Sequence, residues 1–116
     1  MRPGETKGVR MPKYLFRASY TTEGTRGLQQ DGGTGRRNVI EKLVQAKGGH
    51  LESMYFAFGE DDVFLTVDLP NNETAAAIAV AVGAAGGATT KTIVLLTPEE
   101  IDRAVHQTVD YTPPGA

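Results

Sequence analysis

Residues 51–69, which read LESMYFAFGEDDVFLTVDL, decide the fold of this chain. The first part, Leu51 to Phe58, is rich in aromatic residues and is typical of a β-strand. The last part, Val63 to Leu69, alternates apolar and polar residues, as a strand with one buried face does. Residues 59–62 (GEDD) between them have the composition of a turn. The stretch therefore predicts a β-hairpin at the centre of the fold.

Upstream of the hairpin, the sequence predicts a strand, a long loop and a helix. Lys13 to Tyr20 alternates with period two and is expected to be a strand. Residues 21–35 hold five glycines and no apolar periodicity, so we expect a long loop, which in a compact domain is usually functional or disordered. The helix is expected from Arg36 to Lys47, with Thr34 as a cap. Its apolar stripe consists of Val39, Ile40, Leu43 and Val44.

Downstream of the hairpin, the pattern predicts helix, strand and helix. Glu73 to Val82 is alanine-rich and helical, and Thr89 to Leu96 is a β-branched, apolar strand. A short helix follows Thr97-Pro98, which supply a cap and a first-turn proline, and ends at about Gln107. Two β-α-β halves joined by a hairpin predict the α+β class, as a ferredoxin-like β-α-β-β-α-β sandwich. Its four-stranded antiparallel sheet carries helices on one face, and a short C-terminal helix is added.

The composition bounds the domain organisation and excludes several classes of function. Residues 1–10 are polar and are expected to be a flexible leader, and residues 11–116 a single domain. The formal net charge is -2 and there is no basic stripe, so no nucleic-acid partner is expected. The absence of cysteine excludes disulfides, thiolate metal sites and a cysteine nucleophile. No apolar run is long enough for a membrane span, and the start lacks a signal core, so we expect a cytoplasmic protein without a membrane partner.

Four pieces of the sequence together resemble the GYD-domain family of small bacterial proteins. They are residues 12–15 (PKYL) with their alternating continuation, the glycine-rich segment 24–37, the aromatic stretch 55–59 (YFAFG), and Asp62 at the start of the next strand. The resemblance covers residues 11–116. It implies a ferredoxin-like fold related to the dimeric α/β barrels and no settled biochemical function. A homo-oligomer is expected because a chain of 116 residues buries only a small core. Asp61 stands where the family signature has an aromatic residue.

The sheet face away from the helices offers a first candidate site. In the ferredoxin-like order the first strand lies beside the third, so Arg17 and Asp68 are expected on this face, with Glu52 or Tyr55 adjacent. They could form a polar-lined pocket that is closed by a partner subunit or by the glycine-rich loop. Alternatively, this is a solvated face with a weak ion pair.

The glycine-rich segment offers a second candidate site. Its glycines, Gly33 among them, let backbone amides approach an anion, and the next helix supplies its positive end. Arg26, Arg36 and Arg37 add charge suited to a carboxylate or a phosphate. The spacing matches neither a P-loop nor a dinucleotide fingerprint. Alternatively, the segment is a flexible lid whose glycines serve turns.

Other titratable residues give weaker signals. Residues 60–62 are three carboxylates without the spacing of a calcium loop, so we expect a solvated turn and no metal site. His50 and His106 lie in different elements and are expected to be surface residues, although either could act as a general base or a haem ligand. No cofactor is expected.

Three functions remain open. The first is an oligomeric protein that binds a small anionic or aromatic ligand between a sheet face and the glycine-rich loop. The second is a cofactor-free enzyme of dimeric-barrel type, a monooxygenase, lyase or isomerase. Its proton-transfer candidates are Tyr20, Tyr55, His50 and Asp62. The third is a structural interaction module that uses the sheet face only as an interface.

Overall fold

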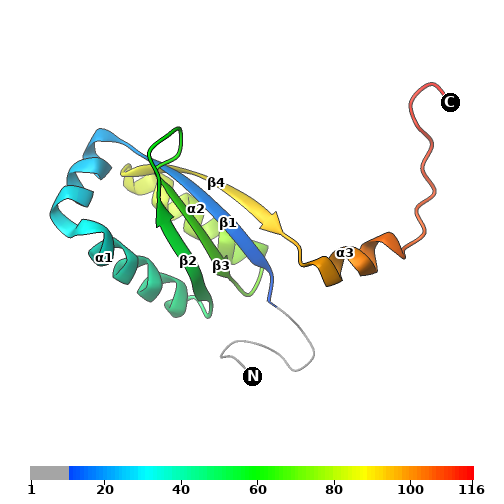
Figure 1. Ribbon diagram of the computed structural model, residues 1–116, viewed down its shortest axis with the longest axis horizontal. Coiled ribbons are helices and arrows are strands. Elements are labelled where there is room, and N and C mark those ends of the chain that lie inside the picture. The colour runs from blue at the N-terminus through cyan, green and yellow to red at the C-terminus, as the bar shows by residue number, and fades with distance from the viewer. Residues whose placement is uncertain (1–10) are drawn as a thin grey trace.

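The computed structural model describes residues 11–116, and the predicted leader lies outside this range. Figure 1 shows seven elements in chain order: β1 (Lys13–Tyr20), α1 (Thr22–Ala46), β2 (His50–Phe56), β3 (Val63–Asp68), α2 (Asn72–Ala85), β4 (Ala88–Leu95) and α3 (Pro98–Val105). The four strands form one antiparallel sheet in the order β2-β3-β1-β4. The predicted α+β fold, its hairpin and its C-terminal helix are therefore confirmed.

The core lies between the sheet and the two helices α1 and α2. Alternation along β1 buries Tyr14 and Phe16 on this side, as the period-two pattern predicts. The hydroxyl of Tyr14 donates a hydrogen bond to Asn72 and so ties β1 to the start of α2. The remaining buried members of the cluster are Val44, Leu51, Val67, Leu69 and Ala75. Val39, expected on the buried stripe of α1, is 48% exposed.

The glycine-rich segment is a helix, and the prediction of a loop over residues 21–35 is wrong. Helix α1 begins directly after Thr21, whose side chain accepts a hydrogen bond from the Gly24 amide at 3.1 Å. Thr34 is therefore inside the helix and does not cap it. The Thr21 amide also donates to the Gly87 carbonyl at 3.0 Å, which anchors the start of α1 to the end of α2. A good cap and a long-range anchor outweigh the low helix propensity of the glycines.

The structure explains why two of these positions are glycine. At Gly24 a Cβ atom would lie 1.9 Å from the Gly87 carbonyl oxygen, so only glycine permits this approach. Gly32 has φ 70° and ψ 170°, which is not helical, and it kinks α1. We call residues 22–31 the first segment of α1 and residues 33–46 its second segment. The kink changes the direction of the helix between its two segments (Figure 1).

Helix α3 differs from α1 and α2, because it extends away from the sheet beyond the end of β4 (Figure 1). None of its residues is buried. No helix within the described part of the chain has the length and apolar character needed to cross a membrane. The cytoplasmic location stays a prediction.

Candidate functional site

A small apolar cavity lies between the sheet and the helices α1 and α2. Its volume is about 90 Å³. The sheet contributes Phe16, Ala18, Tyr20, Met54, Val63, Leu65, Val67, Ala88 and Thr90, and the helices contribute Arg36, Ile40, Leu43, Val44, Ile78 and Val82. A dry cavity of about 150 Å³ is known to accept benzene, so this one holds a short apolar group.

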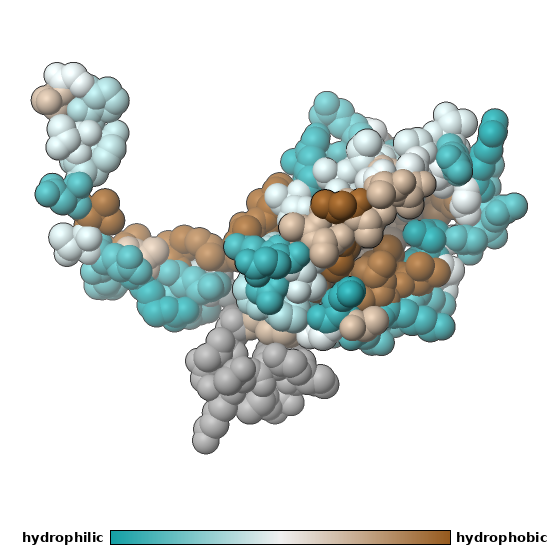
Figure 2. All heavy atoms as spheres, turned by 180° about the vertical axis from the view of Figure 1, so that it is seen from behind, coloured by the Kyte–Doolittle hydropathy of each residue, from teal (hydrophilic) through white to brown (hydrophobic). Residues whose placement is uncertain are grey.

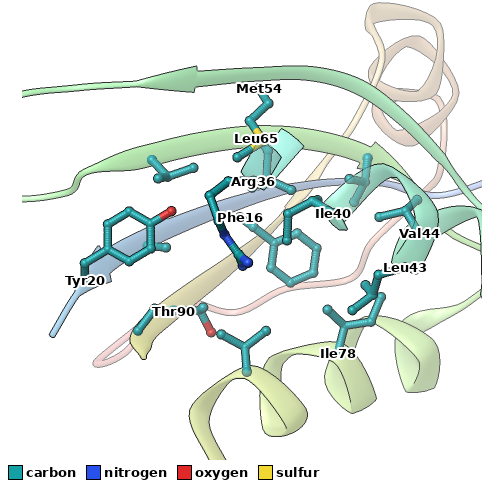
Figure 3. A pocket seen from close by; sticks show the side chains of 15 residues that line it. Phe16, Tyr20, Arg36, Ile40, Leu43, Val44, Met54, Leu65, Ile78 and Thr90 are labelled. Carbon is teal, nitrogen blue, oxygen red and sulfur yellow. The ribbon is translucent and has the colours of Figure 1, made fainter. Parts of the chain in front are cut away.

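Arg36 is the charged residue of this cavity. Figure 3 shows its side chain pointing from α1 toward Phe16 and the Tyr20 ring. Its Nη1 atom lies 3.5 Å from Oδ2 of Asp31, well beyond the roughly 2.7–2.9 Å of a strong charge-assisted hydrogen bond. A guanidinium next to apolar side chains is costly to desolvate unless a good acceptor meets it. The cavity therefore combines an apolar interior with a partly exposed guanidinium whose contact with Asp31 is long.

Helical spacing explains why Arg36 faces inward. Ile40 and Val44 follow it at steps of four residues, so the three side chains lie on one stripe of the second segment of α1. This spacing was available in the sequence. It would have placed Arg36, the expected first residue of the helix, on the same stripe as the core residues.

Two further cavities adjoin the first at the first segment of α1. One, of about 230 Å³, shares Tyr20 and Arg36 with the apolar cavity and reaches Gly24, Leu28 and Asp31. The other, of about 380 Å³, lies toward the hairpin and is lined by Tyr20, Thr25, Leu28, Gly33, Phe56, Ala57, Phe58 and Asp62. Tyr20 lines all three cavities. The first segment of α1 thus lies over Tyr20 with space on either side.

On the opposite, open face of the sheet, Arg17 binds Asp61 and not Asp68. Its Nε and Nη2 atoms lie 2.8 and 2.7 Å from Oδ2 of Asp61. Ser19 donates to the other carboxylate oxygen at 3.2 Å. The hydrogen bond from Arg17 lowers the pKa of Asp61. Asp61 is buried, and its contacts with Arg17 and Ser19 fasten the hairpin turn to β1.

Asp68 lies in a separate ion-pair cluster at the other end of β1. Lys13 Nζ contacts Oδ1 of Asp68 at 2.9 Å and Oε2 of Glu52 at 2.7 Å. Glu52 follows core-facing Leu51 and lies on this face by alternation, and Thr66 also donates to it at 3.0 Å. The hydrogen bond from Lys13 lowers the pKa of Glu52. Partial burial opposes the charge of Lys13, but its bonds to Asp68 and Glu52 raise its pKa overall.

Arg17 and Asp68 do not converge in the structure, and a pocket on this face that is closed by a partner subunit stays a prediction. In the β1–β3 register Lys13 is opposite Asp68, and Arg17 is opposite Phe64. Four residues of strand separate the two positions, which is about 13 Å. The register places both residues on the predicted face but gives each a different partner.

The proton-transfer candidates are also spread over the molecule. Oδ2 of Asp62 accepts a hydrogen bond from the Tyr20 amide at 2.8 Å, at the end of β1. Tyr55 is 71% exposed on the open face, and His50 is exposed at the start of β2. Tyr20 is the one candidate that lines the apolar cavity. Sequence reasoning could not separate it from the others, because each is a titratable residue at the end or on the surface of a strand.

The remaining predicted residues lie outside the apolar cavity. Arg26 and Arg37 are exposed on α1, and Gly33 lies against Phe56 in the hairpin-side cavity. His106 ends α3, where its Nδ1 atom is 2.6 Å from the Asp102 carbonyl oxygen. Within residues 11–116, no group of three or more His, Asp or Glu side chains is placed to hold a metal ion.

A comparison with protein families assigns the chain. The model of the GYD domain matches residues 14–105, which is well over half of the sequence. The chain belongs to the GYD domain family. The matched GYD domain runs from β1 to the end of α3 and includes every residue of the apolar cavity. Searches of curated proteins and of solved structures gave no match. Membership of the GYD family assigns no activity, so the function rests on the geometry of the site.

Proposed function

We propose that this GYD-domain protein binds a small amphipathic acid on the helix-covered face of its sheet. The apolar part of the acid occupies the cavity between the sheet and α1–α2, and its carboxylate meets Arg36. The observation that carries the proposal is the placement of the Arg36 guanidinium in a cavity lined mainly by apolar side chains. Its contact with the Asp31 carboxylate is long, at 3.5 Å. An arginine fork matches a carboxylate with two parallel hydrogen bonds, which Asp31 does not supply at that distance.

The size of the site favours a small ligand. The apolar cavity of about 90 Å³ has room for a short aliphatic chain or the edge of an aromatic ring, and the adjoining space of about 230 Å³ has room for the rest of the ligand with its polar end. Typical pockets for larger ligands are about 300–1,000 Å³. A carboxylate at Arg36 would displace Asp31, whose exposed side chain returns to water at little cost.

The enzymatic alternative depends on Tyr20. Its phenol is the titratable group beside Arg36 in the apolar cavity, so it would donate or accept the proton in any reaction of the bound acid. Asp62, Tyr55 and His50 do not share this cavity with Arg36. Binding of the acid is required in either case and is tested first.

Thermal shifts with matched acids and amides test the proposal. Benzoate and hexanoate carry the charge, and benzamide and hexanamide have similar shape without it. An acid at about 100 times its Kd stabilises the folded state by about 2.7 kcal/mol, which raises Tm by several degrees. We expect this shift for wild type and for Arg37→Met, an exposed control on the same helix.

The variant Arg36→Met keeps the volume of the side chain and removes its charge. We expect it to lose the preference for acids over amides. The proposal is wrong if acids and amides act alike on wild type, or if Arg36→Met responds to the acids as wild type does.

A further inference from the structure

Two hydroxyl groups line the apolar cavity together with Arg36. They belong to Tyr20 at the end of β1 and to Thr90 in β4. Figure 3 shows both side chains on the side of the sheet to which Arg36 points. The remaining side chains around the cavity are apolar. A ligand that fills the cavity therefore meets polar side-chain groups at these three residues.

The register of the sheet makes the two hydroxyl residues neighbours. In the β1–β4 pair, Tyr20 is opposite Ala88. Ala18, two residues earlier on β1, is opposite Thr90, so all four residues share the helix-covered face. Tyr20 and Thr90 form a diagonal pair across the two strands, and such pairs lie about 7–8 Å apart. Because the alanines at the other two corners are short, they leave space above the sheet between the hydroxyl residues.

Neither hydroxyl has a hydrogen-bond partner among residues 11–116. The contact of Tyr20 with Asp62 uses the backbone amide and not the phenol. Polar groups in apolar surroundings normally have a partner, because a lost hydrogen bond to water is otherwise not replaced. A bound molecule with a polar atom between Tyr20 and Thr90 would supply that partner.

The chain holds these two side chains in place before any ligand binds. A Cβ atom at Gly24 would lie 2.9 Å from Cδ1 of Tyr20, so the backbone of α1 packs closely against this ring. Asp62 fixes the backbone of Tyr20 from the other side. Thr90 is β-branched, which restricts rotation about its first side-chain torsion. Groups that are already positioned lose little conformational entropy on binding.

The charge of the cavity favours a neutral polar group beside the two hydroxyls. Of the described residues, those around the cavity include the positive charge of Arg36 and no carboxylate. Asp31 belongs to the adjoining cavity, which Thr90 does not line. An ammonium group near Thr90 would therefore be repelled by Arg36 without a carboxylate beside it. A ligand hydroxyl is neutral, and it can accept a hydrogen bond from one protein hydroxyl and donate one to the other.

The exposed apolar side chains of α3 do not contribute to this site. Ile101 and Val105 are exposed, and Figure 2 shows apolar residues of this part of the chain outside the body of the domain. The cavity is lined from the sheet, α1 and α2. A ligand on the helix-covered face is therefore bound by the body of the domain.

We propose that the acid received by Arg36 is a 2-hydroxy acid, and that Tyr20 and Thr90 hydrogen-bond to its hydroxyl group. This inference rests on the proposed function, since the carboxylate at Arg36 is what brings the adjacent carbon atom to the two hydroxyls. The rest of the acid extends between the apolar side chains of the cavity. With three different groups of one carbon atom in fixed places, the site distinguishes the two enantiomers.

Calorimetric titration of wild type with hexanoate, each enantiomer of 2-hydroxyhexanoate, and 2-aminohexanoate tests the choice of ligand. We expect one enantiomer of 2-hydroxyhexanoate to bind about three- to tenfold more tightly than hexanoate, as befits hydrogen bonds between neutral groups. The amino acid should bind no more tightly than hexanoate, because its ammonium group lies near Arg36.

The variants Tyr20→Phe and Thr90→Val remove the hydroxyls and keep the shape of each side chain. Each should lower the preference for the hydroxy acid about two- to threefold, and the double variant should bind both acids within about twofold of each other. Hexanoate should bind all of them within about twofold of wild type, because it makes no use of the hydroxyls. Thr89→Val, at the exposed neighbouring position of β4, is the control and should keep the full preference. The single variants decide the question if the double variant does not fold.

The outcomes separate this inference from the proposed function. Equal binding of hexanoate and both hydroxy acids by wild type, with loss of hexanoate binding in Arg36→Met, would overturn the 2-hydroxy acid and leave the role of Arg36 intact. Absence of binding of every acid to wild type would overturn both. A preference that survives in both single variants would overturn the roles of Tyr20 and Thr90. Tighter binding of 2-aminohexanoate than of either hydroxy acid would overturn the neutral group.

Discussion

Arg17 and Arg36 lie on opposite faces of one small sheet and have very different partners. Arg17 approaches buried Asp61 with two nitrogen atoms at 2.8 and 2.7 Å. Arg36 points into an apolar cavity and approaches exposed Asp31 at 3.5 Å. The comparison sets an arginine with a structural role beside the one that we propose receives a ligand. The first has a complete, short contact, and the second has a long contact that a better acceptor would replace.

The largest difference between the two faces is expected in their contribution to stability. Phe16 and Leu15 are neighbours on β1, but Phe16 is buried under the helices and Leu15 faces the open side. Phe16→Ala should lower the free energy of unfolding by about 3–5 kcal/mol, and Leu15→Ala by about 1 kcal/mol, because only the first removes a fully packed ring. Urea denaturation measures both. Equal losses would contradict the assignment of the core to the helix-covered face.

Substitutions of two glycines test whether the glycine-rich segment is helical. Gly24→Ala places a Cβ atom 1.9 Å from the Gly87 carbonyl oxygen and should cost about 1–3 kcal/mol. At Gly27 a Cβ atom meets nothing within 4 Å, so Gly27→Ala should stabilise by about 0.4–1 kcal/mol. Denaturation curves of the two variants give opposite signs if the segment is helical. If it is a loop, both substitutions should have small effects of similar size.

The ion pair of the open face predicts a dependence on pH. Arg17 lowers the pKa of Asp61 below its unfolded value of about 3.9, so the folded state binds this proton less readily. The stabilisation is therefore present above about pH 4 and is lost as the pH falls through the lowered pKa. Asp61→Asn should flatten the fall in stability below about pH 4, as measured by thermal unfolding.

Glu60→Gln, at an exposed position in the same turn, is the matched control for this pH profile and should leave its slope unchanged. A profile for Asp61→Asn that is as steep as that of wild type would show that the pair with Arg17 does not stabilise the fold.

The smallest effect is expected from the partner of Arg36. Asp31→Asn removes the carboxylate that competes with a ligand and should tighten the binding of an acid by about two- to fivefold, as befits a weak exposed pair. Glu23→Gln, an exposed change in the first turn of α1, should leave the affinity unchanged. Competition titrations measure both, and weaker binding by Asp31→Asn would mean that Asp31 orients Arg36 and does not compete.

Much of the fold could be predicted, because the alternation of apolar and polar residues indicates both a strand and its buried side. The pattern of Lys13–Tyr20 predicts β1 with its observed bounds and the buried side of Tyr14 and Phe16. The start of α1 could not be predicted from local propensity. It depends on contacts between Thr21 or Gly24 and Gly87, which is more than 60 residues away in the sequence.

The candidate site was predicted in part. Arg36 was among the expected ligand-binding residues, but for its place beside a glycine-rich loop at the expected start of the helix and not for its place on the core side of a longer helix. Arg17 and Asp68 lie on the same face of the sheet but are not paired with each other. Alternation along a strand predicts the face on which a residue lies, whereas the register between two strands decides which residues are its neighbours. The turn residue Asp61, which takes the place of Asp68 as the partner of Arg17, gives no periodic signal.

Calorimetric titration of benzoate or hexanoate, whichever stabilises more, into wild type, Arg36→Met and Arg37→Met tests the central claim most directly. We expect at least about tenfold weaker binding by Arg36→Met, since a charge-assisted bidentate contact contributes about 1.5–3 kcal/mol. Arg37→Met should bind within about twofold of wild type, because Arg37 lies outside the cavity. Equal affinities of wild type and Arg36→Met would contradict the assignment of Arg36 as the residue that receives the acid.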